Sequence, residues 1–311
     1  MGIFEAVVQG IVQGLTEFLP VSSSGHLLLS QHILGVKENN LFFDVMLHLG
    51  TLIAVLAVYY KLVIKLIVAF FEIIKDIFTG NFRWNNLKDE KRMVVMLIIG
   101  LMPLFLLFLP IPGTGSNIKD LAEKLSNQSS IILVGISLLI TSILLSVGIS
   151  KTKNGVGKYS KHSYKKQGKK SFNVLDSICV GFTQCIAAIF PGISRSGSTL
   201  SVGLMRGIDR QAALDYSFIL GIPSIMAAAL LELKEFSESS AGTNIEIMPI
   251  IIGIIVSAVV GFMAIVLFKW LLATDKMNIF VIYTLVVGTL SVIIGIIEMI
   301  NGVNVFTGIP L

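Results

Sequence analysis

The sequence contains few charged residues and almost no cysteine. Of its 311 residues only 14% are charged and 54% are hydrophobic, whereas a soluble domain has about 25% charged residues. A soluble globular domain is therefore excluded. The two cysteines, Cys179 and Cys185, give neither a disulfide framework nor a cysteine-rich zinc site. The N-terminus lacks the basic segment and the small-residue cleavage site of a signal peptide. Because the chain is so hydrophobic and has so few charges, we expect an all-α integral membrane protein.

Six hydrophobic segments reach the length of about 20 residues that a helix needs to cross a bilayer. They are 41–60, 93–109, 131–149, 212–231, 247–268 and 277–297. Two further segments, 3–35 and 174–207, are interrupted by FLPVSSSGH and FPGISRSGST. Interrupted backbone is tolerated at membrane depth only inside protein or along a wet cavity. We therefore predict six transmembrane helices plus two re-entrant helical hairpins, with segment 62–79 at the membrane interface.

Basic residues gather on one side of the predicted spans. Seven of the 24 Lys and Arg residues lie in 61–92 and eight lie in 151–170. The positive-inside rule places these segments in the cytoplasm, so the first hairpin and the C-terminus face outward. Topology thus explains both the basic loop 150–173 and the net charge of +5, and we expect no nucleic-acid partner.

The two interrupted segments resemble each other. The matching residues are Pro20 and Pro191, Ser22 and Ser194, Ser24 and Ser196, Gly25 and Gly197, and Asp44 and Asp215. Each half is a hairpin followed by three spans, and because three is odd the second copy enters the membrane from the opposite side. We predict a single membrane domain, 1–311, with repeat halves 1–149 and 174–299 of inverted topology. In such repeats the site lies where the broken helices meet.

Polar residues inside these membrane segments indicate the chemistry. Glu17 lies one turn before the first break, and an intramembrane carboxylate usually faces a functional cavity. Arg195 is the only basic residue placed within the membrane, and its guanidinium fits phosphate oxygens in bidentate fashion. Ser23 or His26 could attack phosphorus, so the set fits phosphoryl transfer on a phosphorylated lipid. His48, with Leu on both sides in a span, is expected to be a structural histidine.

The remaining polar and small residues of the breaks offer hydroxyl and backbone donors for an anion. We expect a substrate-binding set of Gln13, Ser22, Ser24, Gly25, Gly192, Ser194, Ser196, Gly197 and Thr199. Within this set we favour helix capping as the role of Ser22 and Ser24. The sequence has no GxxxxGK[ST] motif, so this cradle is not a Walker loop.

At these residues the chain resembles the bacterial undecaprenyl-diphosphate phosphatase family, also called the bacitracin-resistance protein family. The family motif [EQ]GxTEFLPVSSxGH is matched by residues 13–26, and PGxSRSGxT is matched by residues 191–199. The resemblance implies hydrolysis of the terminal phosphate of undecaprenyl diphosphate, which recycles the lipid carrier for cell-wall synthesis and confers bacitracin resistance. It also implies a location in the bacterial plasma membrane, with the site opening to the outer face.

The resemblance further implies residue roles and a cofactor. Glu17 would hold a divalent cation, Mg²⁺ or Ca²⁺, or act as a base, and Arg195 would clamp the phosphates. We favour Ser23 as nucleophile with His26 assisting, because residues three apart can share a helical face. Many members carry Glu where this chain has Gln13, which leaves one carboxylate here. The implied partners are a polyprenyl diphosphate lipid and the plasma membrane, with a homodimer left open. The alternative function is a lipid-phosphate flippase or another secondary transporter.

Overall fold

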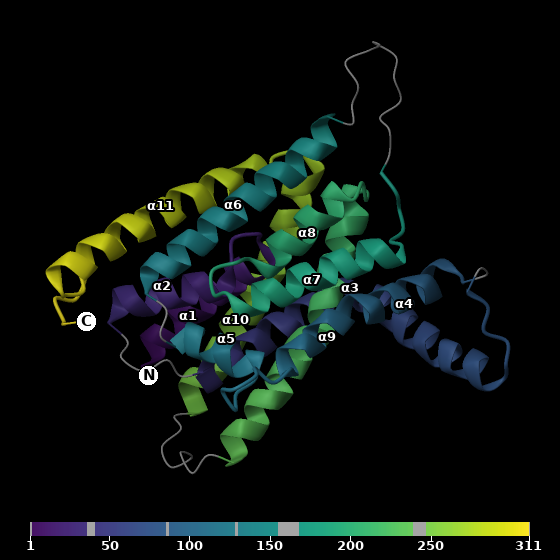
Figure 1. Cartoon of the computed structure of the whole chain (residues 1–311), viewed down its shortest axis with the longest axis horizontal. Helices are drawn as coiled ribbons and strands as arrows, with labels where there is room; N and C mark the ends of the chain where they lie inside the picture. The colour runs from purple at the N-terminus through teal and green to yellow at the C-terminus, as the bar shows by residue number, and fades with distance from the viewer. Residues whose placement is uncertain are drawn as a thin grey trace.

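The chain folds as an assembly of helices (Figure 1), and the computed structural model describes residues 2–35, 41–84, 87–127, 130–154, 168–238 and 247–310. Within those ranges there is no strand, only isolated bridges. The helices are α1 (Ile3–Phe18), α2 (Ser23–Leu34), α3 (Leu41–Phe78), α4 (Asp89–Leu101), the 3-10 helix η2 (Met102–Phe108), α5 (Ile118–Asn127), α6 (Ile131–Asn154), α7 (Val174–Ile189), α8 (Arg195–Met205), α9 (Arg210–Glu238), α10 (Ile247–Ala273) and α11 (Asn278–Asn301). Most of the predicted basic loop 150–173, namely 155–167, lies outside the described residues.

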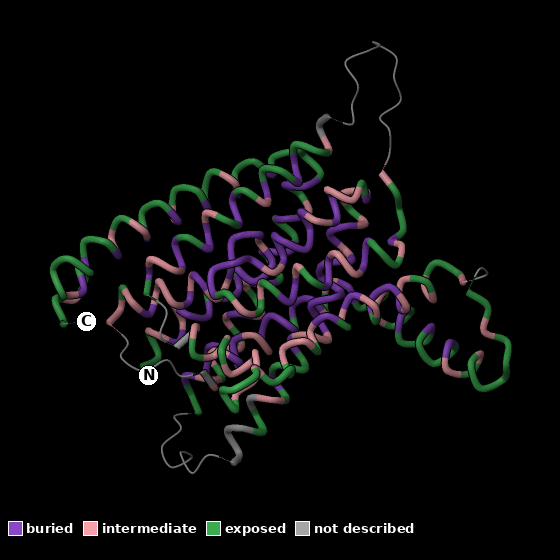
Figure 2. The backbone as a smooth tube through the Cα atoms, viewed as in Figure 1, coloured by how far each residue is buried: buried purple, intermediate pink, exposed green. Residues whose placement is uncertain are grey.

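Six helical segments in the described part of the chain are long and apolar enough to cross a membrane. They are α3, α4 together with η2, α6, α9, α10 and α11. The interior of the assembly is buried, whereas the outer surfaces of helices such as α11 are exposed (Figure 2) and carry large apolar side chains. Apolar surface of this extent is covered by lipid rather than water. The prediction of an all-α, multi-pass membrane protein is confirmed.

Two predicted segments differ from the structure. Helix α3 runs without interruption for 38 residues, so the helix of the predicted span 41–60 continues through segment 62–79. No Pro or Gly occurs between Gly50 and Gly80, and nothing stops the helix earlier. At 1.5 Å per residue it is roughly 57 Å long, and its end protrudes from the body together with the start of α4 (Figure 1). The predicted span 93–109 is divided, because Pro103 disrupts the α-helical hydrogen bonding and the chain continues as η2.

Both interrupted segments form a helix, a break and a second helix. The first helices, α1 and α7, are each 16 residues long. Both end just before a residue with extended backbone, Leu19 in the first and Phe190 in the second. The cause is the following Pro20 or Pro191, which disfavours helical backbone at the residue before it. The same local chemistry therefore breaks the helix at matching places in the two halves.

Small residues bring helices of the two halves into close contact. Helix α1 packs against α10, and α6 packs against α11, which run side by side along one edge of the molecule (Figure 1). An added Cβ at Gly14 of α1 would lie 2.8 Å from the Ser257 carbonyl oxygen and 2.9 Å from the Gly261 nitrogen. An added Cβ at Gly135 of α6 would lie 2.7 Å from the Gly288 carbonyl oxygen. Close backbone approach at small residues is the usual mode of helix association in membranes.

The first prediction concerns Gly14. Gly14→Ala should lower the free energy of unfolding by about 1–3 kcal/mol, as overpacking does, because the methyl group would meet backbone atoms of α10 that cannot move aside. Thermal unfolding of the purified protein in detergent measures the change. Gly2→Ala is the matched control, since an added Cβ at Gly2 meets nothing within 4 Å. Equal stability of the two variants would contradict close α1–α10 packing.

Candidate active site

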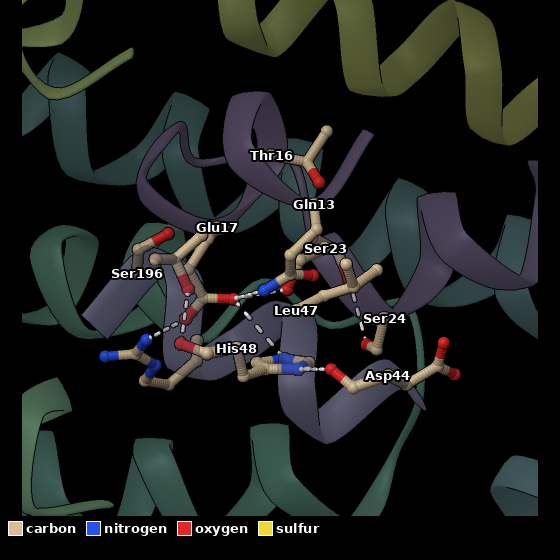
Figure 3. A network of polar contacts seen from close by, with 12 residues as sticks. Gln13, Thr16, Glu17, Ser23, Ser24, Asp44, Leu47, His48 and Ser196 are labelled. Atoms are coloured by element: carbon tan, nitrogen blue, oxygen red, sulfur yellow. Dashed lines mark hydrogen bonds and ion pairs between the residues drawn. The ribbon is translucent and has the colours of Figure 1, made fainter. Parts of the chain in front are cut away.

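The Glu17 carboxylate is the centre of a polar cluster within the helix assembly (Figure 3). Its Oε1 accepts a hydrogen bond from the Arg195 guanidinium, which forms an ion pair with it. Its Oε2 accepts hydrogen bonds from Ser23 Oγ at 2.7 Å and from Gln13 Nε2 at 3.0 Å. The imidazole Nε2 of His48 lies 3.5 Å from the same oxygen. The carboxylate thus has cationic or polar neighbours at both oxygens, which compensates for its burial.

Residues from the N-terminal and C-terminal parts of the chain build this cluster. Glu17 lies in the last turn of α1, and His48 lies near the start of α3. Ser23 is the first residue of α2, and Arg195 is the first residue of α8. The two breaks meet as predicted, because Ser23 from one and Arg195 from the other both contact Glu17. Two helix N-termini therefore meet at one point, where their unpaired N–H groups and dipoles favour an anion.

Serine caps fix the start of both helices. Ser22 Oγ accepts a hydrogen bond from the Gly25 backbone N–H at 3.3 Å, and Ser194 Oγ accepts one from the Gly197 N–H at 3.0 Å. Ser22 has a positive φ of 75°, an uncommon conformation for a residue with a Cβ. Both hydroxyls serve the helix termini in this structure, as capping predicts for Ser22.

The two breaks also bind each other. Ser24 Oγ accepts a hydrogen bond from the Gly192 N–H at 3.4 Å, and Ser196 Oγ donates to the Leu19 carbonyl at 3.2 Å. A Cβ at Gly25 would lie 2.9 Å from the Cα of Gly192, so only glycine fits there. A Cβ at Gly197 would similarly approach the first break to 3.1 Å. These members of the predicted substrate-binding set connect the two halves to each other.

Hydroxyl groups that the sequence did not single out support the second break. Thr141 of α6 donates to the Gly192 carbonyl at 3.3 Å and accepts from the Ser194 N–H at 3.0 Å. Thr199, predicted to bind substrate, instead donates to the Arg195 carbonyl at 2.8 Å and bonds the Ser217 hydroxyl at 2.6 Å. Nothing in the pattern of α6, an apolar span, distinguished Thr141 from an ordinary helical threonine.

Gly221 is a further residue that the sequence did not single out. An added Cβ at Gly221 of α9 would lie 1.8 Å from Nη1 of Arg195. The guanidinium therefore lies directly against the helix backbone, in space that any larger residue would fill. The glycine permits the position from which Arg195 reaches Glu17.

In this structure the His26 ring bonds groups other than Ser23, the residue it is predicted to assist. Nδ1 of His26 bonds the Ser22 carbonyl oxygen at 2.7 Å, and Nε2 bonds the Tyr283 hydroxyl at 2.8 Å. The imidazole ring stacks on the Tyr283 ring, with centroids 5.5 Å apart. Both ring nitrogens are occupied away from Ser23, whose hydroxyl donates to Glu17 instead. Spacing along α2 allowed a shared face, but packing against α11 directs the histidine elsewhere.

The expectation that His48 is only structural also needs correction. Its Nδ1 does bond the Asp44 backbone carbonyl at 2.8 Å, as a structural histidine would. Its Nε2, however, points toward Glu17 (Figure 3). The carboxylate of Asp44 points away from the cluster (Figure 3) and accepts from Gln31. Helical periodicity could not reveal this, because it does not specify which face of α3 turns toward α1.

The cluster has one carboxylate available for a divalent cation. Among the described residues no group of three or more His, Cys, Asp or Glu side chains could hold a metal ion. The neighbouring Gln13 has a buried Oε1 without a hydrogen-bond partner in the described structure. Hard cations prefer oxygen ligands, and Mg²⁺ is often held by one or two carboxylates plus substrate phosphates. Glu17 and Gln13 fit a cation only when phosphate oxygens complete its coordination.

Comparisons with known proteins agree along nearly the whole chain. The family described as Bacitracin resistance protein BacA matches residues 6–290. The undecaprenyl-diphosphatase of Carboxydothermus hydrogenoformans is 36% identical over 289 residues, which cover 93% of this chain and 95% of that protein. The enzyme of the same name from Alkaliphilus metalliredigens is 36% identical over 295 residues, 94% of this chain and 98% of its own. The undecaprenyl-diphosphatase of Methanobrevibacter smithii is 37% identical over 292 residues, which cover 93% of this chain and 96% of that protein.

The second prediction concerns the ion pair. Glu17→Gln should lower the free energy of unfolding by about 3–5 kcal/mol, because it leaves the largely buried Arg195 without a counter-charge. Replacing both residues by Gln should recover part of that loss. Unfolding of the four proteins in detergent gives the coupling energy as a double-mutant cycle.

The more exposed pair Arg210–Asp275, with an N–O distance of 2.6 Å, is the control and should couple by less than about 1 kcal/mol. Equal coupling in the two pairs would contradict a special role for Glu17.

Proposed function

The chain belongs to the family of the bacitracin resistance protein BacA, and on this premise we propose that it hydrolyses undecaprenyl diphosphate. The products are undecaprenyl phosphate and inorganic phosphate, and the reaction returns the lipid carrier to cell-wall synthesis. Removing free lipid diphosphate also accounts for bacitracin resistance. The observation that supports this most directly is the hydrogen bond of 2.7 Å from Ser23 Oγ to Glu17 Oε2, beside the Arg195 guanidinium.

In this proposal Ser23 is the nucleophile and Glu17 is its base. The Ser23 Oγ attacks the terminal phosphorus while Glu17 takes the hydroxyl proton. A bond from Oγ to phosphorus forms, and the bond from phosphorus to the bridging oxygen breaks. Undecaprenyl phosphate then leaves as an anion that needs no proton at neutral pH. Water then attacks the phosphoserine phosphorus, Glu17 returns its proton to Oγ as the bond from phosphorus to Oγ breaks, and inorganic phosphate leaves carrying the two protons of the water.

Arg195 and the two helix N-termini supply the positive potential that the phosphates need. The Arg195 side chain is 20% exposed and Glu17 is 4% exposed, so the guanidinium can contact a ligand without leaving its place against α9. Its planar fork matches phosphate oxygens, and preorganised charge of this kind contributes most of the catalysis in phosphoryl transfer. The ion pair with Glu17 orients the guanidinium before substrate binds.

We propose that Mg²⁺ or Ca²⁺ takes part when the lipid is bound. Glu17 would be its carboxylate ligand, with the Gln13 amide oxygen as a neighbouring contact, and the cation would neutralise phosphate charge. The Gln13 side chain is fully buried, and its Oε1 has no other partner in the described structure. Gln13 already orients Glu17 through Nε2, a role that does not depend on a cation.

The membrane arrangement belongs to the same proposal. The matching helix–break–helix units, each with a serine cap, support an inverted-topology repeat with two re-entrant hairpins. The basic segments 61–92 and 151–170 would lie in the cytoplasm. The site between the breaks would then open to the outer face of the bacterial plasma membrane.

A secondary transporter for a lipid phosphate is the alternative, because inverted repeats are common among transporters. The repeat alone does not separate the two functions. A serine hydroxyl hydrogen-bonded to a carboxylate favours chemistry, since binding and release of a phosphate require no such base. Hydrolysis is therefore the function that the site supports better.

The third prediction tests the reaction and its nucleophile. Purified protein should release phosphate from undecaprenyl diphosphate in detergent, and Ser23→Ala should lower the turnover by about 10²–10⁴-fold. Ser150→Ala, which removes a hydroxyl bonded only to the Val147 carbonyl at the end of α6, should leave turnover unchanged. The assay is run with Mg²⁺, with Ca²⁺ and with EDTA. No release under any of these conditions would contradict the enzyme and favour the transporter.

The fourth prediction concerns Arg195 and the glycine beside it. Arg195→Lys keeps the charge but loses the fork, and turnover should fall at least tenfold, about 1.4 kcal/mol in the barrier. Gly221→Ala should reduce turnover similarly, because its methyl group occupies the space of Nη1. Gly2→Ala is again the control. Normal turnover of both variants would mean that Arg195 provides only a diffuse positive field.

A further inference from the structure

His48 has a fixed ring and one free nitrogen. Nδ1 bonds the Asp44 backbone carbonyl at 2.8 Å, and because a carbonyl only accepts, Nδ1 carries a proton. Nε2 is therefore held in a defined direction. Its distance of 3.5 Å to Glu17 Oε2 is longer than a good hydrogen bond. Nε2 thus has no completed hydrogen bond among the described residues.

The His48 ring is also partly exposed. The His48 side chain is 29% exposed, compared with 4% for Glu17. Ser23 Oγ lies 2.7 Å from the same carboxylate oxygen, so the two hydrogen-bonding atoms are no more than about 6 Å apart, a span that one phosphate group can bridge. His26, by comparison, has both ring nitrogens occupied. His48 is the imidazole whose free nitrogen lies near the proposed nucleophile.

The two copies of the internal repeat differ at the position of His48. Asp44-x4-Leu-Gly50 in α3 matches Asp215-x4-Leu-Gly221 in α9, and the position of His48 is occupied by Ile219 in the second copy. Ile219 is 4% exposed and belongs to the apolar core. Packing therefore accepts an apolar residue at this position of the repeat. The histidine occurs only in the copy that faces Glu17.

We propose that His48 is a phosphate-binding residue of this site, with Nε2 hydrogen-bonded to the lipid diphosphate opposite Arg195. The inference rests on the proposed function for its substrate, and it adds a residue to that site. Arg195 from the second half and His48 from the first half would then hold the diphosphate from two sides.

Inorganic diphosphate is the probe, measured both as a directly binding ligand by calorimetry and as a competitive inhibitor of hydrolysis. His48→Ala should weaken its binding at least tenfold and raise KM for the lipid in parallel, with a smaller effect on kcat. His48→Gln keeps a hydrogen-bonding side chain at this position, and its affinity for diphosphate should lie between those of the wild type and His48→Ala. His32→Gln, which changes a histidine bonded to Glu298, is the matched control and should bind diphosphate normally.

The outcomes separate this inference from the proposed function. Unchanged diphosphate affinity in both His48 variants, or a loss confined to kcat, would overturn a binding role for His48 while hydrolysis by the wild type stands. A wild type that binds diphosphate through His48 but releases no phosphate would overturn the enzyme and keep the binding residue. If His48→Ala unfolds in detergent, the affinity of His48→Gln decides the question.

Discussion

The ion pair between Glu17 and Arg195 is the contact on which the site depends. It joins the end of α1 to the start of α8, elements that lie in different halves of the chain. A buried charge without a partner would cost several kcal/mol, so each half stabilises the charge that the other half contributes. The hydroxyl of Ser23 and the ring of His48 are organised around the same carboxylate.

Close contact between backbones makes that ion pair possible. The two breaks touch through Gly25 and Gly192, and α9 admits Arg195 only because residue 221 is glycine. Serine caps and the hydroxyl of Thr141 satisfy backbone groups that the breaks leave free, as the bilayer requires. Many polar side chains of the two breaks therefore stabilise the backbone at the site. A few side chains at the helix starts remain available for chemistry.

Sequence patterns predicted the elements well and their neighbours less well. The six apolar segments predicted the membrane-spanning helices. The interruptions with proline and serine predicted where two helices break, and the repeat predicted that the two breaks meet. The length of α3 was missed because charged residues after residue 60 were interpreted as the end of the helix. The contacts of His26 and His48 were not predicted, because helix rotation is set by packing against α11 and α1. Periodicity within one helix carries no information about that packing.

The central claim is that one diphosphate is held by both halves of the chain at once. The most direct measurement is a structure of the protein with a polyprenyl methylenediphosphonate, which has the charge of the substrate but cannot be hydrolysed between its phosphorus atoms. The account predicts a terminal phosphonate within hydrogen-bond distance of both Ser23 Oγ and the Arg195 guanidinium. A diphosphonate that contacts residues of one half only, or that binds away from Glu17, would contradict it.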